Sequence, residues 1–415
     1  MTDEALKTRL ATSRLLLSAI LVIVALLAAS SAVLFQAPDL IGKDKILTDF
    51  DAFYIAGSMS ADGRATDTYD ADATFAEQKR MTGDVGFMPW TYPPPYTLLA
   101  QGLASVPIGV SYFLFVSATL AFYLLILRRI AGPFLPGVLI AILPTLLLTV
   151  RTGQNGFLIG GMVGFFLLAF FDRRAIAGLP LGLMVLKPHL AVGISLVALL
   201  GRRWNAIVLA AAVVIVSLTV PTLVFGLGIW PAFIGGVRDA GEFLALGYYP
   251  LFRMTSVYAA ARSFAVPAPL ALTVHAIGAL VAVTLLVFAW RKVRDTRILA
   301  ATVCVASVFV SPYSYDYDLT ILGVGIAFVV ARILENARKW ELVGLLLLAW
   351  FATGYGLQWV VLFGDPETGG YVGLWSLGAP ALIALVVASS IVLRRDQASV
   401  ESRAIVMPAV EPSHG

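Results

Sequence analysis

Long apolar stretches separated by short polar segments run along most of the chain. Many are long enough to cross a membrane as a helix, which takes about 20 residues for about 30 Å of hydrocarbon. No pattern of alternating strands and helices interrupts them. The arrangement predicts an all-α polytopic membrane protein. The stretches lie at roughly 15–36, 109–127, 134–150, 155–171, 175–200, 205–226, 268–290, 298–312, 317–334, 341–363 and 374–393.

Short basic groups lie between the apolar stretches and predict which ends face the cytoplasm, because Lys and Arg accumulate in cytoplasmic loops. Two of these groups flank the single stretch 175–200, so that stretch must cross an even number of times. The sequence "LKPHL" supplies a break at Lys187–Pro188, since proline removes a helix hydrogen bond. We therefore expect about 12 transmembrane passes. The groups are Lys7/Arg9/Arg14, Arg128/Arg129, Arg173/Arg174, Arg202/Arg203, Arg291/Lys292/Arg294, Arg338/Lys339 and Arg394/Arg395.

This orientation predicts one transmembrane domain, residues 15–393, with both termini cytoplasmic and tyrosine, proline and aspartate gathered outside. The expected cytoplasmic parts are residues 1–14 and a disordered tail, 394–415. The first apolar stretch is longer than the apolar region of a signal peptide, and we expect it to remain as the first helix. The expected external segments are the long first loop 37–108, the turns at 151–156 and Lys187, and the segments 227–267, 311–318 and 364–373.

Composition agrees with a membrane domain. The chain is 59% hydrophobic and 13% charged, with a mean hydropathy of +0.88, whereas about 25% of residues are charged in soluble domains. The net charge of +4 is divided among short groups, which does not fit the contiguous basic surface of a nucleic-acid-binding protein. A single cysteine, Cys304, excludes an internal disulfide, and the three histidines show no zinc-ligand spacing.

Two carboxylates, Asp49 and Asp51, follow the first apolar stretch in "LTDFDAFYIAG". A carboxylate at an apolar boundary is a stronger base, so either could accept a proton from an attacking hydroxyl. We place the base at Asp49 first and Asp51 second, because their side chains diverge on a helix or a strand. The alternatives are a helix cap at Thr48 or Asp49 and a solvated loop. A metal-binding Asp-x-Asp would need a nucleotide-binding α/β domain, which the pattern does not predict.

Basic and amide side chains in the predicted external turns are candidates for donor binding. A lysine at a helix break, Lys187, should line a cavity and hold a phosphate, since facing lipid costs about 3 kcal/mol or more; the alternative is that it reaches to the headgroups. His189 beside it is expected to be a polar wall residue. Arg151, Gln154 and Asn155 in "RTGQNG" suit sugar hydroxyls or phosphate, or else helix capping and headgroup contacts.

Three further candidates lie in other external segments. Three prolines in "TYPPPY" predict an extended entry to a helix that starts near Tyr96. Tyr92 in the same motif could stack on a sugar or lie in the interfacial aromatic belt. Of the arginines in 227–267, Arg253 is our choice to meet phosphate. Asp316 and Asp318 begin a helix, where its dipole favours one acid, and acceptor binding or an arginine could account for the other.

Five stretches in order resemble glycosyltransferase family 87: "DFDAFYIAG…GRATDTYD", "WTYPPPYTLLAQGLASVP", "RTGQNGFLIGG", "AGLPLGLMVLKPHLAVGISLVALLGRRW" and "SPYSYDYDL". The resemblance covers about residues 15–335 and implies the GT-C fold of polytopic glycosyltransferases. It implies transfer of a hexose from a polyprenyl-phosphate carrier to an external acceptor, with Asp49 at the position of the catalytic aspartate. One departure is Tyr317, where members of the family often carry a histidine.

The resulting hypothesis is an integral plasma-membrane hexosyltransferase whose active site faces the external or periplasmic side. Its partners are a polyprenyl-phosphate-sugar donor, by preference a mannose donor, and a lipid or glycan acceptor; we expect no nucleic acid, cofactor or metal. A phosphate leaving group needs no general acid, and single displacement inverts the anomeric carbon. The main rival is a transporter or lipid flippase with a broken-helix site, although the chain shows only one clear break. The sequence leaves the acceptor, the hexose and the oligomeric state open.

Overall fold

The computed structural model describes residues 8–41, 47–83, 86–363 and 375–406, and this part of the chain is almost entirely helical. The segment predicted as an external loop at 364–373 lies outside the described residues, as do 1–7 of the N-terminal segment and 407–415 of the tail. The last helix, α19, continues to Val406, beyond residue 394, where we expected a disordered tail to begin.

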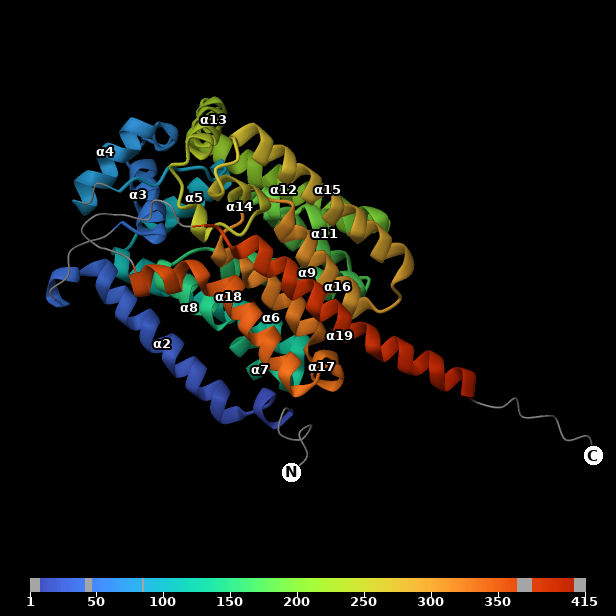
Figure 1. Cartoon of the computed structure of the whole chain (residues 1–415). Coiled ribbons are helices and arrows are strands. Elements are labelled where there is room, and N and C mark those ends of the chain that lie inside the picture. Colours follow the sequence, from blue (N-terminus) through green and yellow to red (C-terminus); the bar gives the residue numbers. More distant parts are fainter. Residues whose placement is uncertain (1–7, 42–46, 84–85, 364–374, 407–415) are drawn as a thin grey trace, which may run out of the picture.

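The helices form a bundle with a cap of further helices at one end (Figure 1). The cap contains α3, α4, α5, α13 and α14, and the bundle contains the other α-helices. The cap helices are Asp49–Ala61 (α3), Ala71–Thr82 (α4), Pro94–Leu103 (α5), Ile229–Leu246 (α13) and Val257–Ser263 (α14). The bundle helices are Arg14–Gln36 (α2), Ile108–Ala131 (α6), Leu135–Ala141 (α7), Leu143–Thr152 (α8), Gly156–Phe171 (α9), Gly178–Leu183 (α10), Val192–Leu200 (α11), Trp204–Phe225 (α12), Ala268–Lys292 (α15), Thr296–Phe309 (α16), Thr320–Asn336 (α17), Lys339–Phe363 (α18) and Gly378–Val406 (α19).

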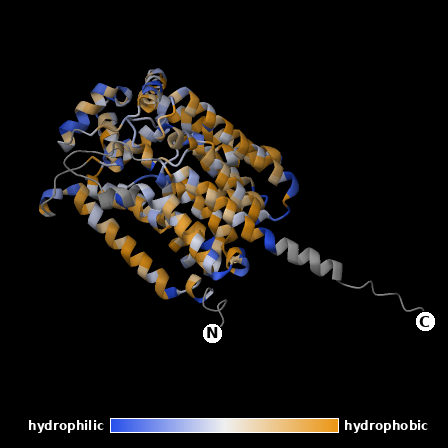
Figure 2. Cartoon of the chain, in the orientation of Figure 1, coloured by the Kyte–Doolittle hydropathy of each residue, from blue (hydrophilic) through white to orange (hydrophobic). Residues whose placement is uncertain are grey.

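Six helical segments of the described chain are long and apolar enough to span a membrane, and several shorter apolar helices pack among them. Leucines on the outer helices are openly exposed, for example Leu15 at 84% and Leu223 at 80%, and Figure 2 shows apolar residues along α2, α12 and α15. Such a surface is unfavourable in water and suits lipid. The chain is thus a membrane protein, while the predicted number of about 12 passes is not established by these lengths. The six segments are 14–36, 108–141, 204–225, 268–292, 316–336 and 378–395.

The core lies where α6, α9 and α17 pack against one another. Tyr123, Phe157 and Phe166 are fully buried there, and the Tyr123 hydroxyl donates to the Thr320 carbonyl at 2.7 Å. This bond satisfies the polar end of a tyrosine that is otherwise surrounded by apolar side chains. The start of α17, which carries Asp316 and Asp318 just before it, is therefore fixed against the centre of the bundle.

The break at Lys187 and the reversal of the chain around it are confirmed. Residues 175–186 form short helical segments, Lys187 leaves the helical conformation at φ −148° and ψ 69°, and α11 leads away on the other side. Arg203 then lies over the ring of Phe170, 5.2 Å from its centre, at the far end of α9. The basic groups at 173–174 and 202–203 thus share one end of the bundle, and Lys187 lies towards the other.

The crossing of α3 and α5 leaves no room for a side chain at Gly57. A Cβ atom there would lie 2.0 Å from the carbonyl oxygen of Ala100, so Gly57→Ala must push the two helices apart, at about 1–3 kcal/mol of stability for an overpacked contact. We expect a lower unfolding temperature in detergent. The matched control is Gly102→Ala in α5, where nothing lies within 4 Å and alanine should add roughly 0.5–1 kcal/mol through its helix preference. Equal stability of the two variants would contradict the close crossing.

Candidate active site

Four segments that are distant in sequence meet at the capped end of the bundle. They are the start of α3 at Asp49, the turn between α8 and α9, the break at Lys187, and a short 3₁₀ helix, η8, spanning Asp316–Leu319. A second 3₁₀ helix, η7 (Leu251–Arg253), joins them, because Met254 pairs with Tyr315 in an antiparallel bridge. Most of the charged and amide residues chosen from the sequence therefore converge on one place.

Asp49 is the first residue of α3, and the cap of that helix is made by its neighbours. The Asp51 carboxylate accepts from the backbone N–H of Thr48 at 3.0 Å and from the Thr48 hydroxyl at 2.9 Å, which completes a capping box. The helix cap predicted as an alternative role is thus made by Thr48 and Asp51, and Asp49 takes no part in the capping box. Half-buried, Asp49 accepts one hydrogen bond at Oδ1, from Gln154 Nε2 at 2.8 Å.

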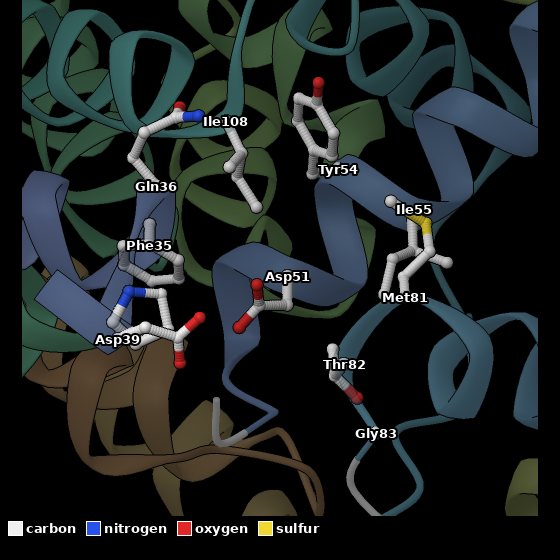
Figure 3. Close-up of a pocket in the computed structure, with 11 residues that line it drawn as sticks. Phe35, Gln36, Asp39, Asp51, Tyr54, Ile55, Met81, Thr82, Gly83 and Ile108 are labelled. Atoms are coloured by element: carbon white, nitrogen blue, oxygen red, sulfur yellow. The ribbon is translucent and has the colours of Figure 1, made fainter. Parts of the chain in front are cut away.

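The side chain of Asp51 points away from the place where these segments meet, as expected from the divergence of Asp49 and Asp51 on a helix. It lines a cavity of about 650 Å³ between the end of α2, α3 and the end of α4 (Figure 3). Asp39, Tyr54 and Met81 lie in the same wall. The two candidate bases therefore face different spaces, and only Asp49 faces the place where the distant segments meet.

The turn "RTGQNG" brings Gln154 to Asp49 because two glycines allow a very close approach. Gly153 has φ +68°, and a Cβ on it would lie 2.7 Å from that of Phe50. A Cβ on Gly156 would lie 2.3 Å from the Tyr317 carbonyl oxygen. The turn is thus wedged between α3 and η8. Gln154 lies between these two contacts.

Gln154 is held from its other side as well. Its Oε1 accepts from the Tyr92 hydroxyl at 3.3 Å and from the Asn155 backbone N–H at 3.1 Å. Burial raises the pKa of Tyr92 well above its usual range, so its hydroxyl stays protonated and available as a donor. Tyr92 is half-buried and stacks on Tyr96 with ring centres 4.3 Å apart.

Two of the basic residues chosen for phosphate, Lys187 and Arg253, are already paired with carboxylates. Lys187 Nζ lies 2.5 Å from Asp318 Oδ1, with side chains 6% and 0% exposed. Arg253 donates from Nε and Nη2 to the two oxygens of Asp316, each at 3.1 Å. Arginine pairing thus accounts for Asp316, the lysine accounts for Asp318, and Lys187 does not reach to the headgroups. Asp318 also accepts from the Tyr315 N–H at 3.1 Å, so it caps η8 too.

Asp49 differs from these acids in having no cationic partner among the described residues. Arg253, Asp316 and Asp318 are near enough to act on it electrostatically, but its one hydrogen bond comes from a neutral amide. Counting Asp49, Asp316 and Asp318 against Lys187 and Arg253, the cluster carries one formal negative charge more than positive. That charge is on Asp49.

The remaining candidates lie around this centre. Arg151 is half-buried at the C-terminus of α8, where the helix dipole favours a cation. Asn155 is fully buried, and its side-chain amide lies beside the Tyr96 hydroxyl. His189, two residues after Lys187, is half-buried, and its Nε2 has no hydrogen-bond partner among the described residues. The described residues include no cluster of three or more potential His, Cys, Asp or Glu metal ligands.

The structure adds two features that sequence reasoning missed. The sequence left open which of Asp316 and Asp318 is a helix-end acid and which meets an acceptor or an arginine, and nothing local indicated that Asp318 pairs with Lys187, 131 residues away. Tyr315 and Tyr317 stack with ring centres 5.4 Å apart, and Lys187 Nζ lies 4.7 Å from the centre of the Tyr317 ring. The lysine therefore has two partners, a carboxylate and an aromatic face.

Removing one partner of the buried Lys187–Asp318 pair should be costly. We expect Lys187→Met to lose about 3–5 kcal/mol of stability, because an uncompensated charge stays buried. Adding Asp318→Asn removes that charge while keeping the acceptor for the Tyr315 N–H, so the double variant should be more stable than the single one. Thermal unfolding in detergent measures both. As a control, Arg80→Met removes an exposed arginine from Glu77, which keeps its pair with Arg64, and should change little. A single variant no less stable than the double one would contradict a buried pair.

Comparison with known proteins gives one match. The model of glycosyltransferase family 87 matches residues 90–312, a range that contains Tyr92, Gln154, Lys187 and Arg253, while Asp49 and Asp316 lie on either side of it. No curated protein and no solved structure matches the chain.

Proposed function

The chain belongs to glycosyltransferase family 87, and on this premise we propose that it transfers a hexose from a polyprenyl-phosphate donor to an external lipid or glycan acceptor. Mannose is the hexose that we propose, on the resemblance described above. The membrane-spanning helices suit a donor whose isoprenoid chain lies in the bilayer. Nucleotide sugars are cytoplasmic, so an enzyme that works outside needs a carrier that crosses the membrane. Family membership does not favour the transporter alternative.

The observation that carries this proposal is the position of Asp49. It is a half-buried carboxylate at the edge of the charged cluster, hydrogen-bonded to Gln154 and without a cationic partner in the described chain. A carboxylate held in this way can accept a proton. In the proposed step, the acceptor oxygen bonds to the anomeric carbon as its proton passes to Asp49. The bond from that carbon to the phosphate oxygen breaks, and the phosphate leaves with the electron pair. The anomeric centre is inverted.

For the donor phosphate we propose Arg253 as the principal contact. Two of its nitrogens, Nε and Nη2, bind Asp316, and Nη1 has no hydrogen-bond partner within the described residues. Its side chain is 18% exposed, against 6% for Lys187. Lys187 keeps two ammonium protons beyond the one that faces Asp318, and Arg151 adds a third cation at the rim. Tyr92 and Asn155 are the proposed contacts for the sugar, and His189 for the wall beside it.

Asp49→Asn and Asp51→Asn form a matched pair, two residues apart on one helix with the same change in charge. Asp49→Asn should lower transfer from polyprenyl-phosphate mannose to membrane lipid extract by about 10²–10⁴-fold, the usual contribution of a general base. Asp51→Asn should keep near-normal turnover and lose about 1 kcal/mol of stability with its helix cap. Transfer assays and thermal unfolding of the purified variants decide between them. Normal turnover in Asp49→Asn with loss in Asp51→Asn would move the base to Asp51.

The external location of the site can be tested with single cysteines in a Cys304→Ser background. Ala61→Cys at the exposed end of α3 should react with a membrane-impermeant maleimide on intact cells. Ala175→Cys, exposed at the opposite end of the bundle beside Arg174, should react only after the membrane is permeabilised. Labelling is read by gel shift. The reverse pattern would place Asp49 in the cytoplasm and contradict the proposed donor.

A further inference from the structure

Tyr92, Gln154 and Asp49 form a chain of hydrogen bonds that runs in one direction. Tyr92 donates its hydroxyl proton to Gln154 Oε1, and the Asn155 backbone N–H donates to the same oxygen. With two donors on Oε1, the oxygen of the amide must face them. The NH₂ group must then face Asp49, where it donates to Oδ1 at 2.8 Å. The amide orientation of Gln154 thus follows from its neighbours.

We propose that Gln154 is a positioning residue that fixes Asp49, holding Oδ1 so that Oδ2 is presented to the acceptor hydroxyl. This inference rests on the proposed function, since it assigns a role relative to Asp49 as the base. Oδ2 accepts no hydrogen bond from the described residues, and it is the oxygen that takes the proton. Gln154 moves no proton itself. Tyr92 acts one step further back, by fixing the amide.

The choice of an amide has a chemical reason. A cation bound to Asp49 would favour its charged form and make it a weaker base, whereas a neutral donor fixes the carboxylate with a smaller effect. The nearby cations are occupied elsewhere, Arg253 by Asp316 and Lys187 by Asp318. The site thus keeps positive charge close to the reaction without pairing it to the base.

The backbone at Gln154 is rigid enough for this role. Gly153 packs against Phe50 on one side of the turn, and Gly156 packs against the Tyr317 carbonyl on the other. The amide therefore has a fixed origin relative to both α3 and η8. A shift of about 1 Å in a reacting group can cost about 10²-fold in rate, so loss of this support should lower turnover.

The test uses Gln154→Leu and Gln154→Glu in the full-length protein, with polyprenyl-phosphate mannose as donor and membrane lipid extract as acceptor. Gln154→Leu should lower kcat by about 10²-fold with little change in the KM for the donor. In Gln154→Glu, a second carboxyl group faces Asp49, so the pair should share one proton over an intermediate pH range. The titratable and charged groups near enough to act electrostatically on Asp49 are unchanged in the variants; they are Tyr92, Arg253, Tyr315, Asp316, Tyr317 and Asp318.

The pH profile separates positioning from a merely structural role. In Gln154→Glu, activity should be highest where one proton restores the bond to Oδ1, and it should fall on the alkaline side, where both carboxyl groups are charged. The unmodified protein should lack this alkaline fall. Gln101→Glu is the matched control, because Gln101 lies in α5 outside the site, and it should leave the profile unchanged.

Two results would overturn the inference. One is a kcat for Gln154→Leu equal to that of the unmodified protein while Asp49→Asn is inactive, since the base would then need no support from Gln154. The other is a Gln154→Glu profile with the same shape as the unmodified one. Full activity of Asp49→Asn would instead reject the proposed function, whatever the Gln154 variants do.

Discussion

Charge that is buried within an apolar helical bundle must be compensated, and this requirement sets the arrangement of the capped end. Lys187 lies at a break between two short 3₁₀ helices, and Arg253 ends the 3₁₀ helix η7. Each is paired with a carboxylate of η8. A charged side chain without such a partner costs several kcal/mol in a low-dielectric interior. The two pairs therefore tie the break at Lys187 and the 3₁₀ helix η7 to the start of α17.

The same requirement explains why one carboxylate is left over. The two acids of η8 neutralise the two cations, and the third, Asp49, approaches from α3 as a half-buried group that is in contact with an amide. An unpaired charge costs less free energy on a half-buried carboxylate than on a fully buried one, because water still reaches part of the group. Asp49 can therefore be present without a cationic partner and still act as a proton acceptor in the proposed reaction.

The sequence predicts the parts of this site that depend on local chemistry. Pro188 removes a backbone donor, so the break beside it could be anticipated, and the divergence of Asp49 and Asp51 follows from helix geometry alone. Local rules also mislead at one point: α5 begins at Pro94 rather than near Tyr96, because a proline's fixed φ suits the first helical turn.

The contacts that the sequence does not predict join distant segments. Lys187 and Asp318 are 131 residues apart, and Gln154 and Asp49 are 105 apart. Each residue was a candidate from its own surroundings, but which side chains meet depends on how the segments that carry them pack together. Tyr92 was expected more readily in the aromatic belt, since nothing near it in sequence indicates that its hydroxyl meets Gln154. Which distant side chains bind one another is decided by tertiary packing, and the local patterns of a single sequence do not predict it.

Tyr317 bears on where the proton can go. Members of the family often carry a histidine at this position, and an imidazole can exchange a proton near neutral pH whereas a phenol does not. Here the ring stacks on Tyr315 and lies against Lys187, so the side chain supports the cation of the buried pair. A chain with tyrosine at this position has one less group that could act as a base beside η8. Under the proposed function, a carboxylate then accepts the acceptor proton, and we propose Asp49 because its charge is not already paired with a lysine or an arginine in the described structure.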